Sequence, residues 1–563
     1  MLKSLFLNLS LINLIGYKKK IYFLFLLIFI CTLIELVGLS ALVPLGLFII
    51  EGNIPDIFQK YFAVDLSKNI NVFYFLFCIF GLVSLRFFFI IFTQYMNEKI
   101  VRDISISLSN KVLESYFKDF KALKYNNTSL AIKNILSEVE LYCKFIKSKI
   151  ILISEVLISL IILILLFSFE FEKTLVIYFA ISILFFIYQN LINKKIKASS
   201  KIREKDQKNA TQTLLEIFGN FKLIKIFNEE SFFTKKFNHL NKNFKKAMYK
   251  NSFFQVIPKN LFEYYFVGLI ILVLVLNFYF FNKIDEGLIS VLIVYLLSFY
   301  RIMPSVSKIL QSKQAITFSK ISEKILFNEL LSYEKKEEIL EENFKIKNFK
   351  NNILIKNLKF NYTNNNNEVE VIKNLNFNIE KGKFIGISGD SGSGKTTLLN
   401  ILMKFLNYQN GEVQVDGVDL KKIIRNDWFS IISYVPQNIF IHNDSIKNNI
   451  VFANQIYCEK KFNEVLKLSN LVDMVNNMSI KENTLLEESG RNISAGQIQR
   501  VGIARALYKK PKILFLDEPT SNLDNINELQ IVNTIKALTP EITVIMISHR
   551  EAALSLCDDI IKL

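Results

Sequence analysis

Histidine, cysteine and tryptophan are scarce in this chain, which has 3, 5 and 1 of them among its 563 residues. The cysteines are scattered, without a Cys-X-X-Cys pair or a metal-site spacing, so the sequence excludes a cysteine-built metal site and predicts small apolar packing roles. Internal repeats are absent too. The first long apolar run lacks a small-residue cleavage pattern and outlasts a signal core, so we expect no cleavable signal. The cysteines are Cys31, Cys78, Cys143, Cys458 and Cys557.

Apolar residues, in contrast, are abundant. Hydrophobic residues make up 51% of the chain and phenylalanine alone numbers 52, which is high for a soluble protein. The length is too great for one hydrophobic core and suits two or three domains. One apolar run of roughly 20 residues is also typical of a buried core helix, but six in order predict a helical membrane domain, because each can cross ~30 Å of hydrocarbon. The runs lie near 21–50, 72–93, 150–169, 174–193, 256–281 and 286–303.

Charges between these runs indicate an orientation. The loops 51–71, 170–173 and 283–286 each carry more acidic than basic residues, whereas 18–20 and 194–250 are strongly basic. By the positive-inside rule, the N-terminus and the C-terminal half are cytoplasmic and the three acidic loops face out. The net charge of +18 is explained by this topology and by contact with anionic lipid. A nucleic-acid partner is the weaker explanation, and we expect none.

A glycine-rich phosphate-binding loop lies in the C-terminal half. It follows the apolar run 384–387, a predicted strand, and precedes 398–405, a predicted helix. Backbone amides of such a turn can wrap a polyanion, so we expect Lys395 to reach the β- and γ-phosphates and Thr396 to offer its hydroxyl to Mg²⁺. A flexible glycine turn is the alternative. The predicted nucleotide-binding residues are Gly389, Asp390, Ser391, Gly392, Ser393, Gly394, Lys395, Thr396 and Thr397.

The elements that follow favour nucleotide hydrolysis over that alternative. A predicted buried strand ends in Asp517 and Glu518, about 120 residues after the phosphate loop. Asp517 can hold Mg²⁺, directly or through water, and Glu518 can act as the general base that orients a water for attack on the γ-phosphate. A lone pair of this kind would more often be a solvated strand end. The further motifs are Gln437, the pentapeptide 493–497, the segment 521–524 and His549 at the end of a second predicted strand.

In the order and spacing of these six motifs, the C-terminal part resembles the nucleotide-binding domain of ABC transporters. The resemblance implies ATP and Mg²⁺ as cofactors. It also implies that His549 contacts the γ-phosphate as a switch and that Gln437 joins Mg²⁺ to the interface with the membrane domain. Tyr362 matches the aromatic residue that stacks on adenine, although a tyrosine packed in the sheet fits nearly as well. The segment 484–490, with Glu488, partly fits the exporters' cross-subunit loop.

The pentapeptide departs from the family's usual Leu-Ser-Gly-Gly-Gln at Ile493 and Ala495. Ser494, Gly496 and Gln497 remain, and the resemblance implies a hydroxyl and a close backbone approach to the γ-phosphate bound by the opposite subunit. The added methyl at Ala495 narrows that approach, so we expect it to affect the rate of ATP turnover. Because one chain cannot close its own loop and pentapeptide on a single ATP in the family's geometry, we expect a homodimer with two sites.

The arrangement of domains follows from the same resemblance. The basic segments 94–149 and 194–255 look like the helical extensions of exporter membrane domains. Within them, 116–125 and 216–225 are predicted coupling segments, although exposed amphipathic helices fit their composition equally well. No N-terminal cysteine-protease domain is found, which argues against a peptide-processing exporter. We expect a transmembrane domain at 1–330, a linker at 331–349 and a nucleotide-binding domain at 350–563.

Ionisable residues within or beside the apolar runs bear on the cargo. A charge at membrane depth is costly unless it is paired or faces water, so such residues are functional candidates. Structural pairing, for example of Arg86 with Glu35, or snorkelling to an interface explains each of them as well. The set comprises Glu35, Arg86, Glu155, Lys259, Glu263 and Arg301.

A second resemblance concerns the segments 256–259 and 299–305, which look like the lipid-linked oligosaccharide flippases of bacterial protein N-glycosylation. In that family a cationic belt in the cavity holds the pyrophosphate of an undecaprenyl-linked glycan. Arg86, Lys259 and Arg301 occupy matching places, with Lys259 where an arginine is expected; lysine keeps the charge but loses the bidentate fork. An apolar stripe at 54–62 fits the family's external helix for the polyprenyl tail, and loop packing explains it at least as well.

The predicted fold is an α-helical six-span ABC exporter membrane domain followed by an α/β P-loop ABC nucleotide-binding domain. We expect a homodimer in a bacterial cytoplasmic membrane that uses ATP to flip a polyprenyl-pyrophosphate-linked oligosaccharide. An exporter of another lipid, a drug or a peptide is the first alternative. A soluble ABC-type ATPase acting on nucleic acid or the ribosome is the second, and six spans argue against it.

Overall fold

The structure is a computed structural model that divides into two compact units, an N-terminal unit at 1–334 and a C-terminal unit at 335–563. The described residues are 16–51, 69–118, 128–169, 171–281, 286–337, 343–364, 367–453, 456–487, 490–520 and 525–563.

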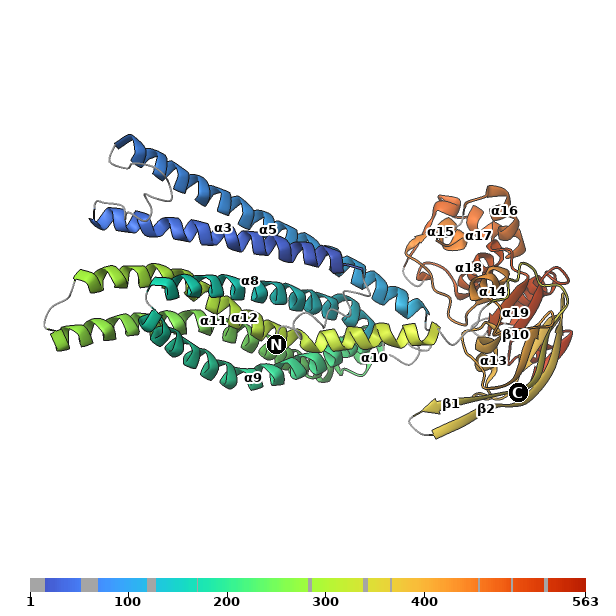
Figure 1. The fold of residues 1–563 in the computed structure, drawn as a ribbon. Helices are drawn as coiled ribbons and strands as arrows, with labels where there is room; N and C mark the ends of the chain where they lie inside the picture. The colour runs from blue at the N-terminus through green and yellow to red at the C-terminus, as the bar shows by residue number, and fades with distance from the viewer. Residues whose placement is uncertain are drawn as a thin grey trace. The chain divides into compact units, whose positions relative to one another are not determined.

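Six long helices make up most of the described part of the N-terminal unit, and each contains one of the predicted apolar runs (Figure 1). They are 31 to 52 residues long, more than the ~20 needed to cross a hydrocarbon layer, so each has length to spare beyond a span. By hydropathy alone, the described residues include one candidate span, 80–117. The helices are α3 (Lys18–Glu51), α5 (Asn69–Lys118), α8 (Val139–Phe169), α9 (Phe171–Gly219), α11 (Glu230–Phe281) and α12 (Glu286–Glu337).

Shorter elements connect these helices. Helix α7 (Thr128–Lys133), the π-helix η1 (Asn134–Glu138) and α8 follow one another without a break. The six-residue helix α10 (Phe221–Ile226) begins just after α9 ends, inside the predicted coupling segment 216–225. Helix α12 continues to Glu337, within the stretch predicted as a linker.

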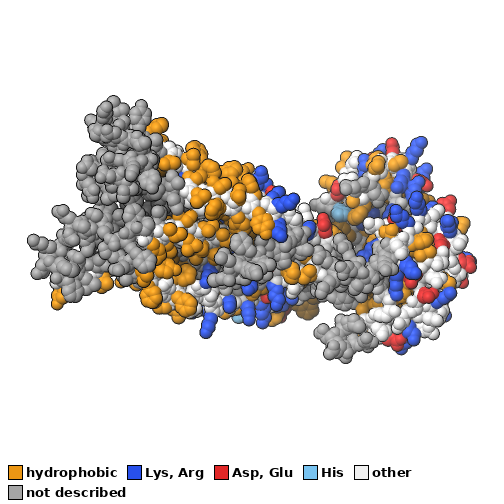
Figure 2. Space-filling model, viewed as in Figure 1, with side chains coloured by type: hydrophobic (Ala, Val, Ile, Leu, Met, Phe, Trp, Pro, Cys, Tyr) orange, Lys and Arg blue, Asp and Glu red, His pale blue; other side chains and the backbone are white. Residues whose placement is uncertain are grey.

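Large apolar side chains cover much of the visible face of the N-terminal unit, whereas lysines and arginines gather toward the end where α10 lies (Figure 2). Phe88 on α5, Phe186 on α9 and Tyr264 on α11 are 68%, 65% and 84% exposed. Soluble proteins rarely show apolar patches of this extent, because such surface is unfavourable in water. The pattern is typical of helices that contact lipid.

The C-terminal unit contains a parallel five-stranded sheet in the order β11-β3-β10-β9-β6 and an antiparallel sheet in the order β2-β1-β4-β5. Strands β7 and β8 form a separate pair. The strands are β1 (Asn352–Asn364), β2 (Asn367–Glu380), β3 (Phe384–Ser388), β4 (Asn410–Val415), β5 (Val418–Asp419), β6 (Ile432–Val435), β7 (Asp444–Ser445), β8 (Leu485–Leu486), β9 (Ile513–Asp517), β10 (Thr543–Ile547) and β11 (Asp559–Lys562).

The parallel sheet separates two hydrophobic cores. Successive side chains of a strand point to opposite faces, so Phe515 packs with α13 and α14 while its neighbour Leu514 packs with the helices α15 to α19. Burial of both faces explains why four successive residues of β9, 513–516, and four of β10, 544–547, are apolar in the sequence. The helices are α13 (Lys395–Leu402), α14 (Arg425–Ile431), α15 (Ile446–Val451), α16 (Glu459–Leu468), α17 (Val472–Asn476), η2 (Lys481–Asn483), α18 (Ala495–Tyr508), α19 (Asn525–Lys536) and α20 (Glu551–Leu554).

This strand order positions the candidate site. Strands β3, β10, β9 and β6 are neighbours and all run parallel, so their carboxyl ends meet at one edge of the sheet. The phosphate loop follows β3, Glu518 follows β9, and His549 and Gln437 lie just beyond β10 and β6. In open parallel sheets, ligands bind beyond the carboxyl ends of the strands.

Candidate nucleotide-binding and hydrolysis site

The phosphate loop is a turn that requires glycine. Gly389, Gly392 and Gly394 have φ values of +149°, +85° and +102°, which side chains rarely allow. A Cβ at Gly389 would lie 2.4 Å from the carbonyl oxygen of Leu563, and one at Gly394 would lie 2.8 Å from Val371 Cγ1. Helix α13 begins directly after this loop, three residues earlier than predicted, so its N-terminal amides face the turn.

Lys395 is the first residue of α13 and is buried. Its Nζ donates hydrogen bonds to the carbonyl oxygens of Gly389 at 2.9 Å and Asp390 at 2.7 Å, which holds the positive charge across the loop. The Oγ of Ser393 is buried and has no hydrogen-bond partner within the part of the chain that the structure describes. A glycine cradle with a central cation and an unsatisfied hydroxyl fits a nucleotide phosphate.

The oxygen atoms expected to hold Mg²⁺ lie at the same edge. Thr396 is exposed beside the loop, and Asp517 ends β9 with 9% of its surface exposed. Burial raises the pKa of the Asp517 carboxyl and the neighbouring Glu518 adds to this, while a hydrogen bond from Tyr434 and the charge of Lys395 act in the opposite direction. A hydroxyl and a carboxylate are ligands that Mg²⁺ prefers, so these residues fit the ion.

Glu518 brings together the three predicted catalytic residues. Its Oε2 accepts a hydrogen bond of 2.7 Å from Gln437 Nε2, and its Oε1 lies 3.3 Å from His549 Nε2. The backbone amide of Glu518 donates to Ile547 O at 3.1 Å, and its φ of +48° turns the chain sharply after β9. The side chain remains 24% exposed, so water can reach the carboxylate that its two neighbours hold in place.

Glu528 on α19 supports this arrangement and is absent from the sequence predictions. It is 2% exposed; its Oε1 accepts a hydrogen bond of 3.2 Å from Thr520 Oγ1, and its Oε2 accepts one of 2.6 Å from Arg550 Nη1. One buried carboxylate therefore ties the chain after Glu518 to the residue after His549. The only sequence signal is an acidic residue three positions before the buried apolar pair 531–532, and its partners cannot be read from the sequence.

The pentapeptide forms the start of α18. Ser494 caps the helix: its Oγ accepts a hydrogen bond from the Gln497 amide at 3.2 Å, and Gln497 Oε1 accepts one from the Ser494 amide at 2.9 Å. This reciprocal box satisfies two of the amides at the helix start. Ser494 and Ala495 are exposed and Gly496 is half-buried, so the first turn of α18 is accessible from outside the chain.

Tyr362 lies on β1 beside the start of α13. Its ring packs edge-on against Phe360, with centroids 4.9 Å apart, and its hydroxyl lies 3.2 Å from Thr397 Oγ1. These are the contacts of a tyrosine packed in the sheet. Stacking on adenine stays a prediction.

Several predicted features lie outside the described residues. They are the segments 521–524 and 54–62, the residues 119–125 of the first predicted coupling segment, Glu488, and the side chains of Glu35 and Arg301.

A cavity of about 1210 Å³ lies within the N-terminal unit, lined by α3, α5, α8, α11 and α12. Of the residues predicted for the cationic belt, Arg86 lines this cavity, whereas Lys259 is exposed on α11 and lies outside the cavity lining that the described residues form. Inside, Lys308 Nζ lies 2.7 Å from Glu155 Oε1, and Lys147 pairs with Glu98. The charged side chains at the cavity are Arg86, Glu98, Glu140, Lys144, Lys147, Glu155 and Lys308.

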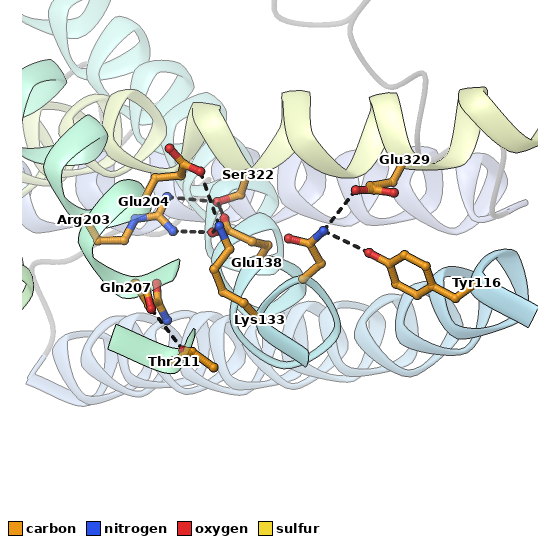
Figure 3. Close-up of polar contacts among 10 residues, drawn as sticks. Tyr116, Lys133, Glu138, Arg203, Glu204, Gln207, Thr211, Ser322 and Glu329 are labelled. Atoms are coloured by element: carbon orange, nitrogen blue, oxygen red, sulfur yellow. Dashed lines mark hydrogen bonds and ion pairs between the residues drawn. The ribbon is translucent and has the colours of Figure 1, made fainter. Parts of the chain in front are cut away.

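A second polar cluster of this unit is sealed from water and joins helices distant in sequence (Figure 3). Glu138 on η1 accepts a hydrogen bond of 2.8 Å from Arg203 Nη1 on α9, and Lys133 Nζ lies 3.2 Å away; all three side chains are at most 1% exposed. Ser322 on α12 donates to the same carboxylate. Burial alone would raise the pKa of Glu138, but Arg203 and Lys133 outweigh it and hold that pKa below its ordinary value. Next to it, Asn134 contacts Tyr116 on α5.

Comparison with protein families matches both units. The family described as ABC transporter transmembrane region matches residues 21–305, and the family described as ABC transporter matches 372–521. A Rickettsia prowazekii protein named "Putative export ATP-binding/permease protein" is 28% identical over 558 residues, which cover 97% of this chain and 92% of that protein. An ATP-dependent lipid A-core flippase of Pectobacterium atrosepticum is 35% identical over 192 residues, covering 34% and 33% of the two chains.

A solved structure supports the same fold. A bacterial Atm1-family ABC exporter with ATP bound superposes with a TM-score of 0.74 over 97% of this chain and 93% of its own, at 18% identity. The predicted fold class is confirmed: a helical transmembrane region precedes a nucleotide-binding domain of sheets and helices. The chain therefore belongs to the ABC transporter family, as a membrane-embedded exporter half-transporter that hydrolyses ATP.

Proposed function

We propose that two copies of this chain form an exporter that flips a polyprenyl-pyrophosphate-linked oligosaccharide to the outer leaflet of a bacterial cytoplasmic membrane. The hydrolytic part rests on one observation, the meeting of Gln437 and His549 on the carboxylate of Glu518. The basic segments 18–20 and 194–250 support a cytoplasmic N-terminus and ATPase domain.

Glu518 is the general base in this proposal. Gln437 and His549 each contact one of its oxygens, so they fix the direction in which the carboxylate can accept a proton from water. Lys395 and the glycine turn hold the phosphates in this proposal. Thr396 and Asp517 would hold Mg²⁺, which would supply charge neutralisation. In this proposal His549 also senses the γ-phosphate, because it contacts Glu518, which orients the water that attacks this phosphate.

The homodimer completes each site. Ser494 and Gly496 lie at an accessible helix start, whose amides and hydroxyl suit the γ-phosphate of the partner's nucleotide. Half-transporters of this fold are generally dimeric, and the predicted geometry requires two chains for two closed sites.

Helix α10 is the coupling segment of this proposal. Its side chains Phe221, Leu223 and Ile226 are 56%, 55% and 76% exposed on a helix of only six residues. Exposed apolar residues at a chain reversal suit docking on another protein surface, as the resemblance to exporter coupling segments implies. Nucleotide-driven closure would then move α9 and α11, the helices that flank α10.

The cavity supports an anionic, amphipathic cargo. Arg86, Lys144, Lys147 and Lys308 line it together with apolar side chains such as Ile90 and Ile151. Lys147 and Lys308 are paired with carboxylates, and Arg86 and Lys144 add two further cations to the lining. A pyrophosphate offers strong acceptors for such groups, and its polyprenyl tail suits the apolar outer surface. The similarity to a lipid A-core flippase, which covers a third of the chain, supports a lipid cargo in general.

The test is flipping of a defined polyprenyl-pyrophosphate-linked glycan in proteoliposomes. We expect Arg86→Gln with Lys144→Gln to lower the ATP-dependent rate by about tenfold or more, because two charge-assisted contacts are lost. The control is Lys259→Gln, outside the cavity, which should flip at the wild-type rate. Unchanged flipping by the double variant would overturn the cavity assignment. Stimulation of ATP turnover by hydrophobic drugs but not by the pyrophosphate lipid would favour a drug exporter instead.

A further inference from the structure

We propose that Arg505 is a positioning residue: it fastens helix α18, with the pentapeptide at its start, to the loop that carries Gln437. We call residues 437–445 the glutamine loop. The inference rests on the proposed role of the pentapeptide in the partner's site and goes beyond it, because it assigns the part that sets where the pentapeptide lies. Three contacts along one side of α18 carry it.

The first contact lies next to the catalytic carboxylate. The side chain of Gln437 holds Glu518 at 2.7 Å, while its backbone carbonyl accepts a hydrogen bond of 3.4 Å from Gln499 Nε2 on α18. Gln499 is buried. One residue therefore contacts the general base with its side chain and the pentapeptide's helix with its backbone.

The second contact is steric. Gly502 lies three residues further along α18, and a Cβ at this position would come within 2.2 Å of Ile439 Cδ1. The absence of a side chain lets the glutamine loop lie directly against the helix backbone. Any Cβ here must push Ile439 away, so the fit of loop on helix is set at this point.

The third contact is the guanidinium of Arg505, another three residues along. Its Nη1 donates to the carbonyl oxygen of Phe440 at 2.7 Å, and its Nε donates to that of Asn449 at 2.7 Å. Its Nη2 donates to Asn449 Oδ1 at 3.1 Å. The planar fork of arginine thus spans two points of the chain that lie before and after the end of the glutamine loop.

Asn449 makes that end of the loop rigid. Its side chain is fully buried, and its Nδ2 lies within hydrogen-bond distance of the carbonyl oxygens of His442, Asp444 and Ser445, at 3.0, 3.2 and 3.1 Å. Its Oδ1 accepts from the His442 amide at 2.9 Å. Arg505 therefore holds a pre-ordered loop rather than a flexible one.

The setting of Arg505 makes its contacts costly to lose. Burial lowers the pKa of its guanidinium to about 10, so it keeps its charge at neutral pH. The guanidinium carbon lies 5.0 Å from the Phe452 ring centroid. An alanine at 505 would leave the carbonyl oxygens of Phe440 and Asn449 without this donor.

The geometry explains how the position is transmitted. Residues 499, 502 and 505 recur every third position, so they lie along one side of α18. The helix is 14 residues long, or roughly 21 Å, and is capped at its start, so it moves as a rigid rod. A displacement of the glutamine loop therefore moves Ser494. In the reverse direction, closure of the pentapeptide on the partner's nucleotide displaces Gln437 and Glu518.

The chain offers a matched control on the same helix. Arg500 directs its guanidinium elsewhere: Nη1 donates to Asn470 O at 3.0 Å and Nη2 to Gln530 Oε1 at 2.9 Å. Replacing Arg500 removes a cation from α18 while leaving the contacts of Arg505 and the glutamine loop in place.

The experiment measures ATP hydrolysis and nucleotide binding by the full-length transporter in lipid nanodiscs. We expect Arg505→Ala to lower kcat by about ten- to a hundredfold while the dissociation constant for ATP stays within about threefold. The reason is that a misplaced pentapeptide affects the closed state in which ATP is hydrolysed. Arg505→Lys should recover part of kcat, since lysine can reach one carbonyl but not both. Arg500→Ala should keep kcat within about threefold of wild type. Equal losses in the two alanine variants would overturn the inference.

A second pair of variants tests the same contact without removing a charge. Gly502→Ala should lower kcat because its methyl displaces Ile439, and adding Ile439→Ala should restore it by making room. A merely destabilised helix would not be rescued by a second cavity-forming change. Failure of rescue, with both proteins folded, contradicts the inference.

Ser494→Ala separates this inference from the function on which it rests. Low kcat in both Ser494→Ala and Arg505→Ala supports the two together. Wild-type kcat in Ser494→Ala would remove the pentapeptide's proposed role, whereas an inactive Ser494→Ala with a fully active Arg505→Ala would remove the role of Arg505 alone.

Discussion

Two groups of charged side chains, one in each unit, are held in opposite ways. At the proposed hydrolysis site the side chains of Glu518 and His549 remain 24% and 45% exposed, and each is fixed by one or two neighbours. In the N-terminal unit Glu138 and Arg203 are fully buried and joined by a hydrogen bond of 2.8 Å. The first group must admit ATP and water, whereas the second must exclude water to hold helices together. Loss of a charge in the first group should therefore stop ATP hydrolysis. Loss of a charge in the second group should lower the stability of the N-terminal unit.

The largest effect is expected at the exposed site. Glu518→Gln should lower the rate of ATP hydrolysis by about a hundredfold or more, because the amide cannot accept a proton from water. ATP binding and the thermal unfolding midpoint should remain near wild type, since the shape is kept. Glu551→Gln, on an exposed carboxylate at the start of α20, is the control and should hydrolyse normally. Full activity in Glu518→Gln would end the assignment of the general base.

The buried cluster should show the reverse pattern. Arg203→Ala should destabilise the N-terminal unit by about 3–5 kcal/mol, because it leaves the Glu138 carboxylate buried with one cation fewer. Lys236→Ala, which breaks an exposed pair with Glu216, should cost at most about 1 kcal/mol. Thermal unfolding of the purified transporter measures both. Similar losses in the two variants would contradict the contrast between buried and exposed pairs.

Acid should act on the same cluster. Because Arg203 and Lys133 hold the pKa of Glu138 below its ordinary value of 4.5, this carboxylate contributes stability above that pH and loses it as the pH falls through the lower folded value. The wild-type midpoint should therefore fall on acidification below about pH 4.5. Glu138→Gln should start lower and show a shallower decline. Parallel pH curves for the two proteins would argue against this linkage.

The smallest effect concerns Tyr362, where two roles compete. Removing only its hydroxyl, as in Tyr362→Phe, should change ATP affinity by less than about threefold, because one exchangeable hydrogen bond to Thr397 is lost. If the ring stacks on adenine, Tyr362→Ala should weaken binding by about tenfold, within the 1–3 kcal/mol typical of base–aromatic stacking. Equal affinity for ATP in the wild type, Tyr362→Phe and Tyr362→Ala would leave only the packing role.

The same contrast explains what could be predicted from the sequence. Gln437, Glu518 and His549 each follow an apolar strand, and parallel strands deliver their carboxyl ends to one edge, so a linear pattern sufficed to bring them together. The helix start at Lys395 differed by three residues from the prediction, because the left-handed Gly394 begins the helix at once.

Contacts between helix faces could not be predicted in this way. Lys144, Lys147 and Lys308 lie at the cavity, yet nothing in the sequence distinguishes them from the other lysines outside the apolar runs. Lys259 was placed with Arg86 by resemblance, but it is exposed and lies outside the cavity lining that the described residues form. A helix offers several sides, and the apolar run does not say which one lines a cavity. The contacts of Glu528, Arg505 and Glu138 could not be predicted either, because their partners lie on other elements.

The π-helix η1 carries one more consequence. A π-turn accommodates one residue more than an α-helical turn, and each residue rotates a helix by about 100°. Deleting a single residue within 134–138 would let the stretch from Thr128 to Phe169 wind regularly. Everything on one side of the deletion would then be turned relative to the other, so the length of this short insert decides whether Glu138 faces Arg203 or a different neighbour.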